Sequence, residues 1–246
     1  MFTKFSYSQP IFLKDVFMKV ILDSLLEGAA RARGTVIIID VFRAFTTAAV
    51  AFSRGASHIY LVSEVEEALD LRRRGIAQLC MGEVGGVKPD GFNFGNSPFE
   101  ILTAEVAGKV ICQSTRAGTV GVVSATQADS LFVSSLVIAS ATAKAVREQN
   151  PELVTIVAMG VGGCDRTDED EQCALYLRNL LQGRQPSSCS VRNLILSGES
   201  SLQFEDIRQQ QFHPMDREIA LNINSYDFAI KVSTQGKFLV AEPVYL

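Results

Sequence analysis

Residues 35–52 read TVIIIDVFRAFTTAAVAF. The first five, Thr35–Ile39, are all β-branched, which is typical of a strand buried on both faces of a sheet. The residues from Ala44 to Ser53 are small or apolar and predict a helix packed against that strand. A strand that leads into a helix through a short loop is the unit from which α/β proteins are built.

The same alternation continues along the chain, with strand patterns roughly every 20 to 40 residues. Strands are predicted at Thr35–Ile39, Ile59–Val62, Gln78–Met81, Val110–Cys112, Leu131–Ser134, Leu153–Ala158 and Lys237–Glu242. Helices are predicted at Ala44–Ser53, Glu64–Arg74, Pro98–Ala107, Gly118–Thr126, Ala139–Gln149 and Glu169–Leu181. We therefore expect one α/β domain over residues 1–246, with a mostly parallel or mixed sheet.

The C-terminal quarter of the chain is harder to interpret than the rest. The motifs described below all fall within about residues 34–182. The stretch Gln182–Ser190 combines Gly, Pro and Ser and predicts a linker or an exposed loop. Residues 183–246 are expected either to complete the sheet or to cover a pocket.

Composition and charge exclude several classes of protein. The chain is 47% hydrophobic and 20% charged, which predicts a packed core and excludes disorder over most of its length. A net charge of −4 leaves no basic surface for general nucleic-acid binding. Five cysteines without a C-x-x-C pair argue against a disulfide framework and fit a reducing compartment. With only two histidines, a metal site would rest on oxygen ligands, so Mg²⁺ is the first expectation.

The sequence also predicts where the protein works. The longest apolar run, Val36–Phe52, contains Asp40 and Arg43 and is therefore a poor membrane span. Residues 1–17 lack an apolar segment followed by a small-residue cleavage site, so we predict no signal peptide. A cytoplasmic protein that binds no membrane is expected. The oligomeric state is left open, a homo-oligomer included.

One internal similarity suggests two related halves. At an offset of 73 residues, VFRAFT around Arg43 aligns with STRAGT around Arg116. Both copies follow an apolar strand, open a helix of small residues and lead to another strand. Two similar strand–loop–helix units would place the two arginines at corresponding strand ends. Chance agreement is the alternative, because two units fall short of a repeat array.

Open α/β sheets carry their sites beyond the carboxyl ends of strands, which directs attention to four loops. These loops hold Asp40–Arg43, Glu83 with the segment GFNFGNSP at 91–98, Gln113–Thr119, and Gly160–Asp170. Together they supply carboxylates, arginines, hydroxyls and glycines. That set suits an anionic ligand bridged by a divalent metal ion.

Asp40 and the two arginines each allow a functional and a structural interpretation. Asp40 follows four apolar β-branched residues, as metal-ligating or nucleophilic carboxylates do; the alternative is a helix N-cap or an ion pair with Arg43. Arg43 and Arg116 offer paired donors that match a phosphate or sulfonate, or they neutralise nearby carboxylates. Because a cation at a helix N-terminus is unfavourable without an anion, we favour anion binding for both.

The remaining loop residues are likewise open to two interpretations. Glu83 lies among glycines that let the backbone approach a ligand, but a solvated loop carboxylate has the same pattern. Ser97–Pro98 predicts an N-cap and a helix start with free N–H groups, while Asn93 and Asn96 are harder to explain structurally. Thr167–Asp170 resembles a capping box whose carboxylates could instead ligate Mg²⁺.

The order and spacing of these motifs resemble one known family. IDVFRAFTT, MGE, GFNFGNSPFE and STRAGT, followed by a glycine-rich loop and an acidic helix start, resemble the 2-phosphosulfolactate phosphatase (ComB-type) family. The resemblance implies a three-layer α/β/α fold and a Mg²⁺-dependent hydrolase acting on a small anionic phosphomonoester. The activity for which the family is named converts 2-phosphosulfolactate to 3-sulfolactate and phosphate in coenzyme M biosynthesis.

The loops and the resemblance together imply a set of site residues. The expected catalytic residues are Asp40, Arg43, Glu83 and Arg116. The expected substrate-binding residues are Asn93, Gly95, Asn96, Ser97, Ser114, Thr115, Gly118 and Thr119. The expected Mg²⁺ ligands are Asp40, Glu83, Glu169 and Asp170. The nucleophile is either a metal-bound water or Asp40; we favour water because Asp40 lacks a second Asp two residues on.

The chain departs from the family pattern at three places. Val84 stands where relatives carry Arg, Asn93 stands in place of Asp, and STRAGT, with its Arg116, replaces T-N-G-T. These changes redistribute charge, so two alternatives stay open. One is a phosphatase on the same scaffold that acts on another phosphorylated hydroxy acid. The other is a non-catalytic binder of anionic metabolites.

Overall fold

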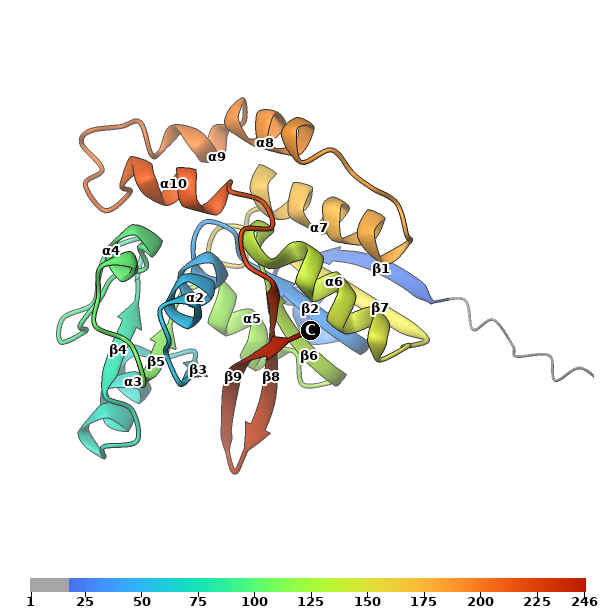
Figure 1. Cartoon of the computed structure of the whole chain (residues 1–246). Coiled ribbons are helices and arrows are strands. Elements are labelled where there is room, and N and C mark those ends of the chain that lie inside the picture. Colours follow the sequence, from blue (N-terminus) through green and yellow to red (C-terminus); the bar gives the residue numbers. More distant parts are fainter. Residues whose placement is uncertain (1–17) are drawn as a thin grey trace, which may run out of the picture.

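The computed structural model describes residues 18–246, so the prediction that residues 1–17 contain no signal peptide lies outside the described residues. Nine strands form one sheet in the order β1-β7-β2-β6-β8-β9-β3-β5-β4 (Figure 1). The strands are β1 (Lys19–Ser24), β2 (Gly34–Ile39), β3 (His58–Val62), β4 (Leu79–Gly82), β5 (Val110–Ser114), β6 (Ala128–Ser134), β7 (Leu153–Ala158), β8 (Phe228–Gln235) and β9 (Phe238–Tyr245). The predicted α/β class with a mixed sheet is confirmed.

The sheet consists of two parallel blocks joined by an antiparallel hairpin. Strands β1, β7, β2 and β6 form one block, and β3, β5 and β4 form the other. The C-terminal hairpin β8–β9 lies between them and pairs antiparallel with β6 on one side and β3 on the other. Three successive antiparallel pairings make the two blocks run in opposite directions. The hairpin at 228–245 thus supplies the centre of the sheet.

Helices cover both faces of the sheet and make the three layers. They are α1 (Leu25–Arg31), α2 (Ala44–Ser53), α3 (Val65–Arg73), α4 (Pro98–Leu102), α5 (Gly118–Ser124), α6 (Ala139–Glu148), α7 (Asp168–Leu181), α8 (Ser188–Leu196), α9 (Glu199–Leu202) and α10 (Pro214–Ala220). Successive residues of β2 point to opposite faces. Val36 and Ile38 therefore pack in a core with α2 and α5, while Ile37 and Ile39 pack with α6 and α7.

Helices α2 and α5 pack on one face of the sheet against strands of both blocks. Their core contains apolar residues of β2 and β6 from one block and of β3 and β5 from the other. Figure 1 shows both helices lying between the blocks. The loops that open α2 and α5 therefore meet, although β2 and β5 run in opposite directions. Each of these loops follows the carboxyl end of its strand, but the hairpin makes the strands of the second block run opposite to those of the first.

Several elements differ from prediction. Strands β1 and β8 and helices α1, α8, α9 and α10 were not predicted. Helix α4 ends at Leu102 instead of Ala107, and Val106 is buried in the core beyond it. Helix α8 begins inside the predicted loop Gln182–Ser190, because the Ser187 hydroxyl accepts a hydrogen bond from the Ser190 N–H at its start.

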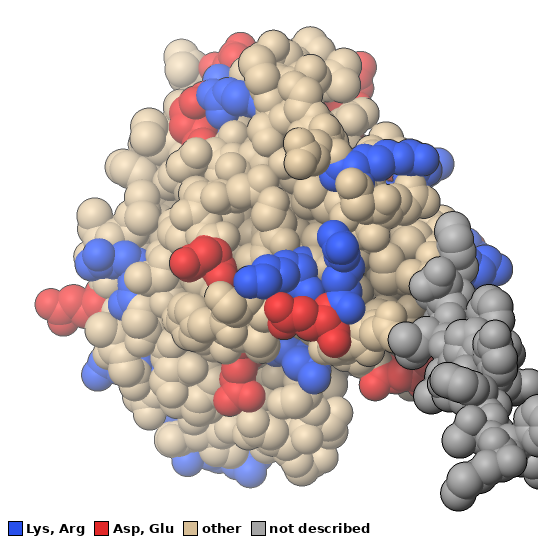
Figure 2. Space-filling view, turned by 45° about the vertical axis from the view of Figure 1, so that its right-hand side comes forward, with Lys and Arg blue, Asp and Glu red and all other residues tan. Residues whose placement is uncertain are grey.

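Charge on the surface is mixed. On the described residues of the face shown in Figure 2, Lys and Arg side chains are interleaved with Asp and Glu, and neither sign covers an extended area. Within residues 18–246 no helix combines the length and apolar character needed to cross a membrane.

Candidate active site

A cavity of about 770 Å³ lies where the loops after β2, β4, β5 and β7 approach the segment between α9 and α10. It receives side chains from all four loops singled out in the sequence. The predicted residues that line it are Asp40, Arg43, Glu83, Asn96, Arg116 and Glu169. Thr167 and Asp168, from the predicted capping box, line it as well. The remaining expected site residues lie outside this lining: Asn93, Gly95, Ser97, Ser114, Thr115, Gly118, Thr119 and Asp170. The segment from α9 to α10 adds Glu199, Ser200, Gln203, Gln209 and Phe212.

Asp40 is the buried carboxylate at the centre of the site. Its Oδ1 accepts a hydrogen bond from the N–H of Ala44, 2.9 Å away, at the start of α2. Burial raises the pKa of Asp40 to about 7, and the negative charges of Glu83 and Glu169 contribute to the rise. A carboxylate with this pKa is poised to exchange a proton or a cation near neutral pH.

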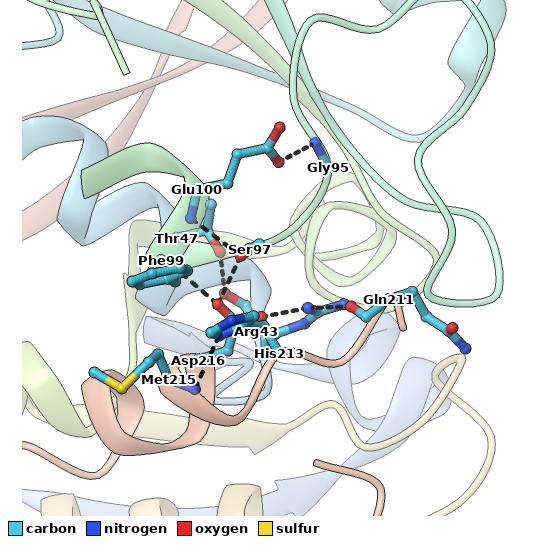
Figure 3. Close-up of polar contacts among 10 residues, drawn as sticks. All are labelled: Arg43, Thr47, Gly95, Ser97, Phe99, Glu100, Gln211, His213, Met215 and Asp216. Atoms are coloured by element: carbon cyan, nitrogen blue, oxygen red, sulfur yellow. Dashed lines mark hydrogen bonds and ion pairs between the residues drawn. The ribbon is translucent and has the colours of Figure 1, made fainter. Parts of the chain in front are cut away.

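Arg43 does not pair with Asp40. Its Nη1 donates to Oδ2 of Asp216 at 2.6 Å and to the carbonyl oxygen of Gln211 at 2.7 Å (Figure 3). The guanidinium carbon also lies 4.8 Å from the centroid of the Phe212 ring. Arg43 is therefore a buried arginine that lines the cavity, and the partners of its guanidinium group all come from the C-terminal segment.

Glu83 ties two loops together. Its Oε1 accepts from the N–H of Arg116 at 2.8 Å, and its Oε2 accepts from the N–H of Gly86 at 2.7 Å. The side chain of Arg116 is 39% exposed, and its nearest carboxylate, that of Glu64, lies 3.8 Å away. Ion pairs of this length and exposure are weak. The charge of Arg116 is consequently available to a ligand in the cavity.

The start of α7 contributes two buried carboxylates, Asp170 and Glu169, with different surroundings. Asp170 accepts from the N–H of Val41 at 2.7 Å through Oδ1 and from that of Gly160 at 2.8 Å through Oδ2. It thereby joins the β2–α2 loop to the β7–α7 loop. Glu169 lines the cavity instead, and burial raises its pKa. Within the described chain its buried Oε2 has no hydrogen-bond partner, and the same holds for Oγ1 of Thr167.

Thr167 occupies the N-cap position of α7, as the capping-box pattern predicts. Its hydroxyl, however, makes no capping hydrogen bond, so only the position agrees with that pattern.

The GFNFGNSP segment divides between the cavity and the scaffold. Asn96 lines the cavity, and its buried Oδ1 lacks a partner among residues 18–246. Ser97 caps α4 as predicted, accepting from the N–H of Glu100 at 3.2 Å. Asn93 accepts from Arg72 and from the N–H of Cys80, and the N–H of Gly95 donates to Glu100. Asn93 and Gly95 thus hold the loop in shape.

The residues after β5 form the support behind the cavity. The carbonyl oxygen of Ser114 accepts from the N–H of Glu83 at 3.0 Å. The N–H of Thr115 donates to Oγ1 of Thr119 at 2.8 Å. Gly118 lies against Asp40, so close that an added Cβ would come within 2.8 Å of Oδ2. These four residues position Glu83 and Asp40 from behind.

Comparison with known proteins agrees with this geometry. The family model described as 2-phosphosulpholactate phosphatase matches residues 21–217. The chain belongs to this family. A probable 2-phosphosulfolactate phosphatase of Bacillus subtilis is 32% identical over 213 residues, covering 85% of this chain and 92% of the relative. A protein with the same name from Thermus thermophilus is 40% identical over 129 residues, covering 52% of this chain and 54% of the relative. Another from Thermoplasma acidophilum is 30% identical over 177 residues, covering 68% of this chain and 79% of the relative.

The donor set of this family member fits a cation bound by few protein ligands. Five carboxylates line the cavity against three arginines, so an anionic ligand would meet excess negative charge unless a cation joined it. Among the described residues, however, no three Asp, Glu, His or Cys side chains are grouped to hold one ion. Mg²⁺ is commonly bound by one or two carboxylates together with substrate phosphate. Asp40 and Glu169, whose charges act on each other, fit that arrangement.

Several residues of this phosphatase-family site were not found from the sequence. Phe212, Gln209 and Ser200 line the cavity from a segment that the sequence analysis left unassigned. Arg166 also lines it, from the predicted loop Gly160–Asp170, and pairs with Glu171 through two hydrogen bonds of 2.7 and 2.9 Å; it was not among the expected site residues. No motif marks Phe212, Gln209 and Ser200, since they reach the cavity only through the tertiary fold.

Proposed function

We propose that this chain is a Mg²⁺-dependent phosphatase that hydrolyses 2-phosphosulfolactate to 3-sulfolactate and phosphate. One observation carries the proposal: carboxylates and arginines from four separate loops surround a single cavity, and Asp40, Arg43 and Glu169 among them are buried. Membership in a family whose relatives are named for this substrate supports it. The substrate carries a phosphate, a sulfonate and a carboxylate, and so needs both arginines and a cation to balance its charge.

The two arginines bind anionic groups in different ways. Arg43 is buried and fixed, so it offers donors with a set direction to phosphate oxygens. Arg116 is partly exposed and weakly paired, so it offers a mobile charge to a second anionic group of the substrate. Glu83 holds the backbone of Arg116 and thereby keeps that charge at the cavity.

Asp40 and Glu169 are the residues that would hold Mg²⁺. When bound, the ion would neutralise charge on the phosphate oxygens. The N–H of Ala44 and the buried position fix the Asp40 carboxylate. Asp170 keeps the β2–α2 and β7–α7 loops, which carry Asp40 and Glu169, at a constant separation.

In the hydrolysis, a water oxygen bonds to phosphorus while the bond between phosphorus and the substrate's C2 oxygen breaks. The products are inorganic phosphate and the 2-hydroxy acid. Because such transition states are loose, positioning and charge stabilisation supply most of the catalysis. We retain water as the nucleophile in preference to Asp40. Trapping of a phosphate group covalently bound to Asp40 would overturn that choice.

Two of the three departures from the family pattern lie away from the cavity lining. Asn93 bonds to Arg72 and to the backbone of Cys80, and Val84 is exposed. The alternative of a non-catalytic binder depended on Asn93 standing in place of Asp. Because Asn93 does not line the cavity, this replacement takes no carboxylate away from the cavity wall. Of the three departures only Arg116 lines the cavity. It is therefore the departure that favours a different phosphorylated hydroxy acid as substrate.

Initial rates of phosphate release should be measured on 2-phosphosulfolactate, 2-phospholactate, phosphoglycolate and p-nitrophenyl phosphate. The proposal predicts the highest kcat/KM on 2-phosphosulfolactate. A higher value on another phosphorylated hydroxy acid would replace the substrate but keep the reaction. For the metal, Mg²⁺ should raise the Tm of wild-type protein but not that of Asp40→Asn. An equal rise in both would remove Asp40 from the proposed Mg²⁺ ligands.

A further inference from the structure

Asp216 is a fully buried carboxylate on α10 that lies outside the cavity lining. Its Oδ2 accepts from Nη1 of Arg43 at 2.6 Å. Its Oδ1 accepts from the Ser97 hydroxyl at 2.6 Å and from the N–H of Phe99 at 3.0 Å. Figure 3 shows these contacts converging on one carboxylate from three directions.

This carboxylate joins two walls of the cavity that are remote in sequence. Arg43 belongs to the loop between β2 and α2, 173 residues before Asp216. Ser97 lies 119 residues before Asp216 and directly follows Asn96, which lines the cavity. A shift of Asp216 would therefore move both a guanidinium and an amide at the cavity surface.

Arg43 is held on one side only. Nη1 is bonded to Asp216 and to the carbonyl oxygen of Gln211, and the Phe212 ring lies against the guanidinium plane. In the described part of the chain, Nε and Nη2 of Arg43 form no hydrogen bond to protein, while the residue lines the cavity. A guanidinium is planar and its donors are rigidly spaced, so fixing Nη1 fixes the direction of the other donors.

We propose that Asp216 is a positioning residue for anion binding. It orients the free edge of Arg43 and the backbone at Asn96 toward the phosphate group in the cavity. Asp216 also offsets the charge of Arg43, so Arg43 acts through the direction of its donors more than through net charge. The inference rests on the proposed phosphatase function and names a residue through which that function is set up.

The test compares Asp216→Asn with wild type and with Glu218→Gln. Glu218 lies on the same helix and pairs with Arg192 at 2.7 Å, away from the cavity, so it is a matched control. Asp216→Asn should raise KM and the Kd for inorganic phosphate about tenfold each and lower kcat as well. Glu218→Gln should match wild type. A purely structural role would reduce the active fraction and leave KM and Kd unchanged, which would overturn the proposal.

Non-additivity gives a second criterion. If Asp216 acts in part through Arg43, then Asp216→Asn should raise the Kd for phosphate by a smaller factor in an Arg43→Lys background than in wild type. An equal factor in both backgrounds would contradict the proposal.

Side-chain ¹⁵N NMR of wild-type protein keeps the test valid should Asp216→Asn fail to fold. The Arg43 guanidinium, assigned by its loss in Arg43→Lys, should rotate slowly on the NMR timescale. Fast rotation would overturn the proposal.

Phosphate binding separates this inference from the proposed function. Wild type that binds phosphate but hydrolyses no ester would refute the phosphatase, while the Kd comparison would still decide the role of Asp216. Wild type that neither binds phosphate nor turns over any ester would refute both.

Discussion

A Cβ atom at Gly118 would lie 2.8 Å from Oδ2 of Asp40. The same atom would lie 2.9 Å from the Cβ of Ala44 and 3.1 Å from the Phe45 ring. The start of α5 therefore packs so closely on the central carboxylate that only glycine fits. Because Gly118 has no side chain, the start of α5 can lie directly against Asp40 and the start of α2.

Gly118→Ala should therefore displace Asp40 and lower kcat/KM at least about tenfold, with a loss of about 1–3 kcal/mol in stability from overpacking. Steady-state kinetics and urea unfolding measure the two effects. Gly95→Ala is the matched control, because its nearest new contact, Oε2 of Glu100, would be an ordinary 3.4 Å. Equal losses in both variants would contradict the tight packing at Asp40.

The raised pKa of Asp40 predicts a pH dependence of stability. Its folded-state pKa of about 7 lies above the usual aspartate value of 3.8, so the folded protein holds this proton more tightly than the unfolded chain. The stabilisation is complete below pH 3.8 and is lost as the pH rises through 7. At about 1.4 kcal/mol per pKa unit, the loss is about 4 kcal/mol.

Asp40→Asn removes this titration, so in EDTA the Tm of the variant minus that of wild type should increase between pH 4 and pH 8. Differential scanning calorimetry over that range is the measurement. A difference that stays constant with pH would show that the folded protein does not raise the pKa of Asp40.

Asp170 should matter more for stability than for ligand contact. Asp170→Asn replaces one acceptor oxygen by an N–H₂ group that faces a backbone N–H, because both carboxylate oxygens accept from main-chain donors. We expect a loss of about 1–3 kcal/mol in the free energy of unfolding. Asp129→Asn, at an exposed position on β6, should change stability little. An unchanged Tm in Asp170→Asn would contradict this structural role.

The two arginines should respond differently to lysine. Arg43→Lys loses the planar donor pair and the contact with Phe212, so kcat/KM should fall about 100-fold. Arg116→Lys keeps a mobile positive charge at the cavity, so kcat/KM should fall less than about tenfold. Equal falls in both variants would show that net charge, not donor direction, sets the contribution of Arg43.

Local sequence patterns predicted the buried strands and the helix starts well. The Ile run of β2 is covered on both faces, and Ser97–Pro98 caps α4, so both features are set by neighbouring residues. Strand β1 was missed because it is only partly buried at the sheet edge, where the apolar pattern is weak. The similarity of the two halves around Arg43 and Arg116 stays a prediction, although both arginines line the cavity.

Relationships between distant segments could not be predicted. Nothing in the sequence around Asp216 indicates that it meets Arg43 and Ser97 more than a hundred residues away. The insertion of β8–β9 between the two parallel blocks also follows from tertiary pairing alone. The predicted roles in catalysis, substrate binding and metal binding, and the cytoplasmic location, stay predictions.

The most direct test is phosphate release from 2-phosphosulfolactate by wild type and Asp40→Asn, each with Mg²⁺ and with EDTA. The account predicts turnover by wild type with Mg²⁺ and loss of turnover in EDTA. It also predicts at least about 100-fold slower release by Asp40→Asn than by wild type with Mg²⁺, and no release by either protein in EDTA. Two results would contradict the account: wild-type turnover that EDTA does not change, or turnover by Asp40→Asn that equals that of wild type.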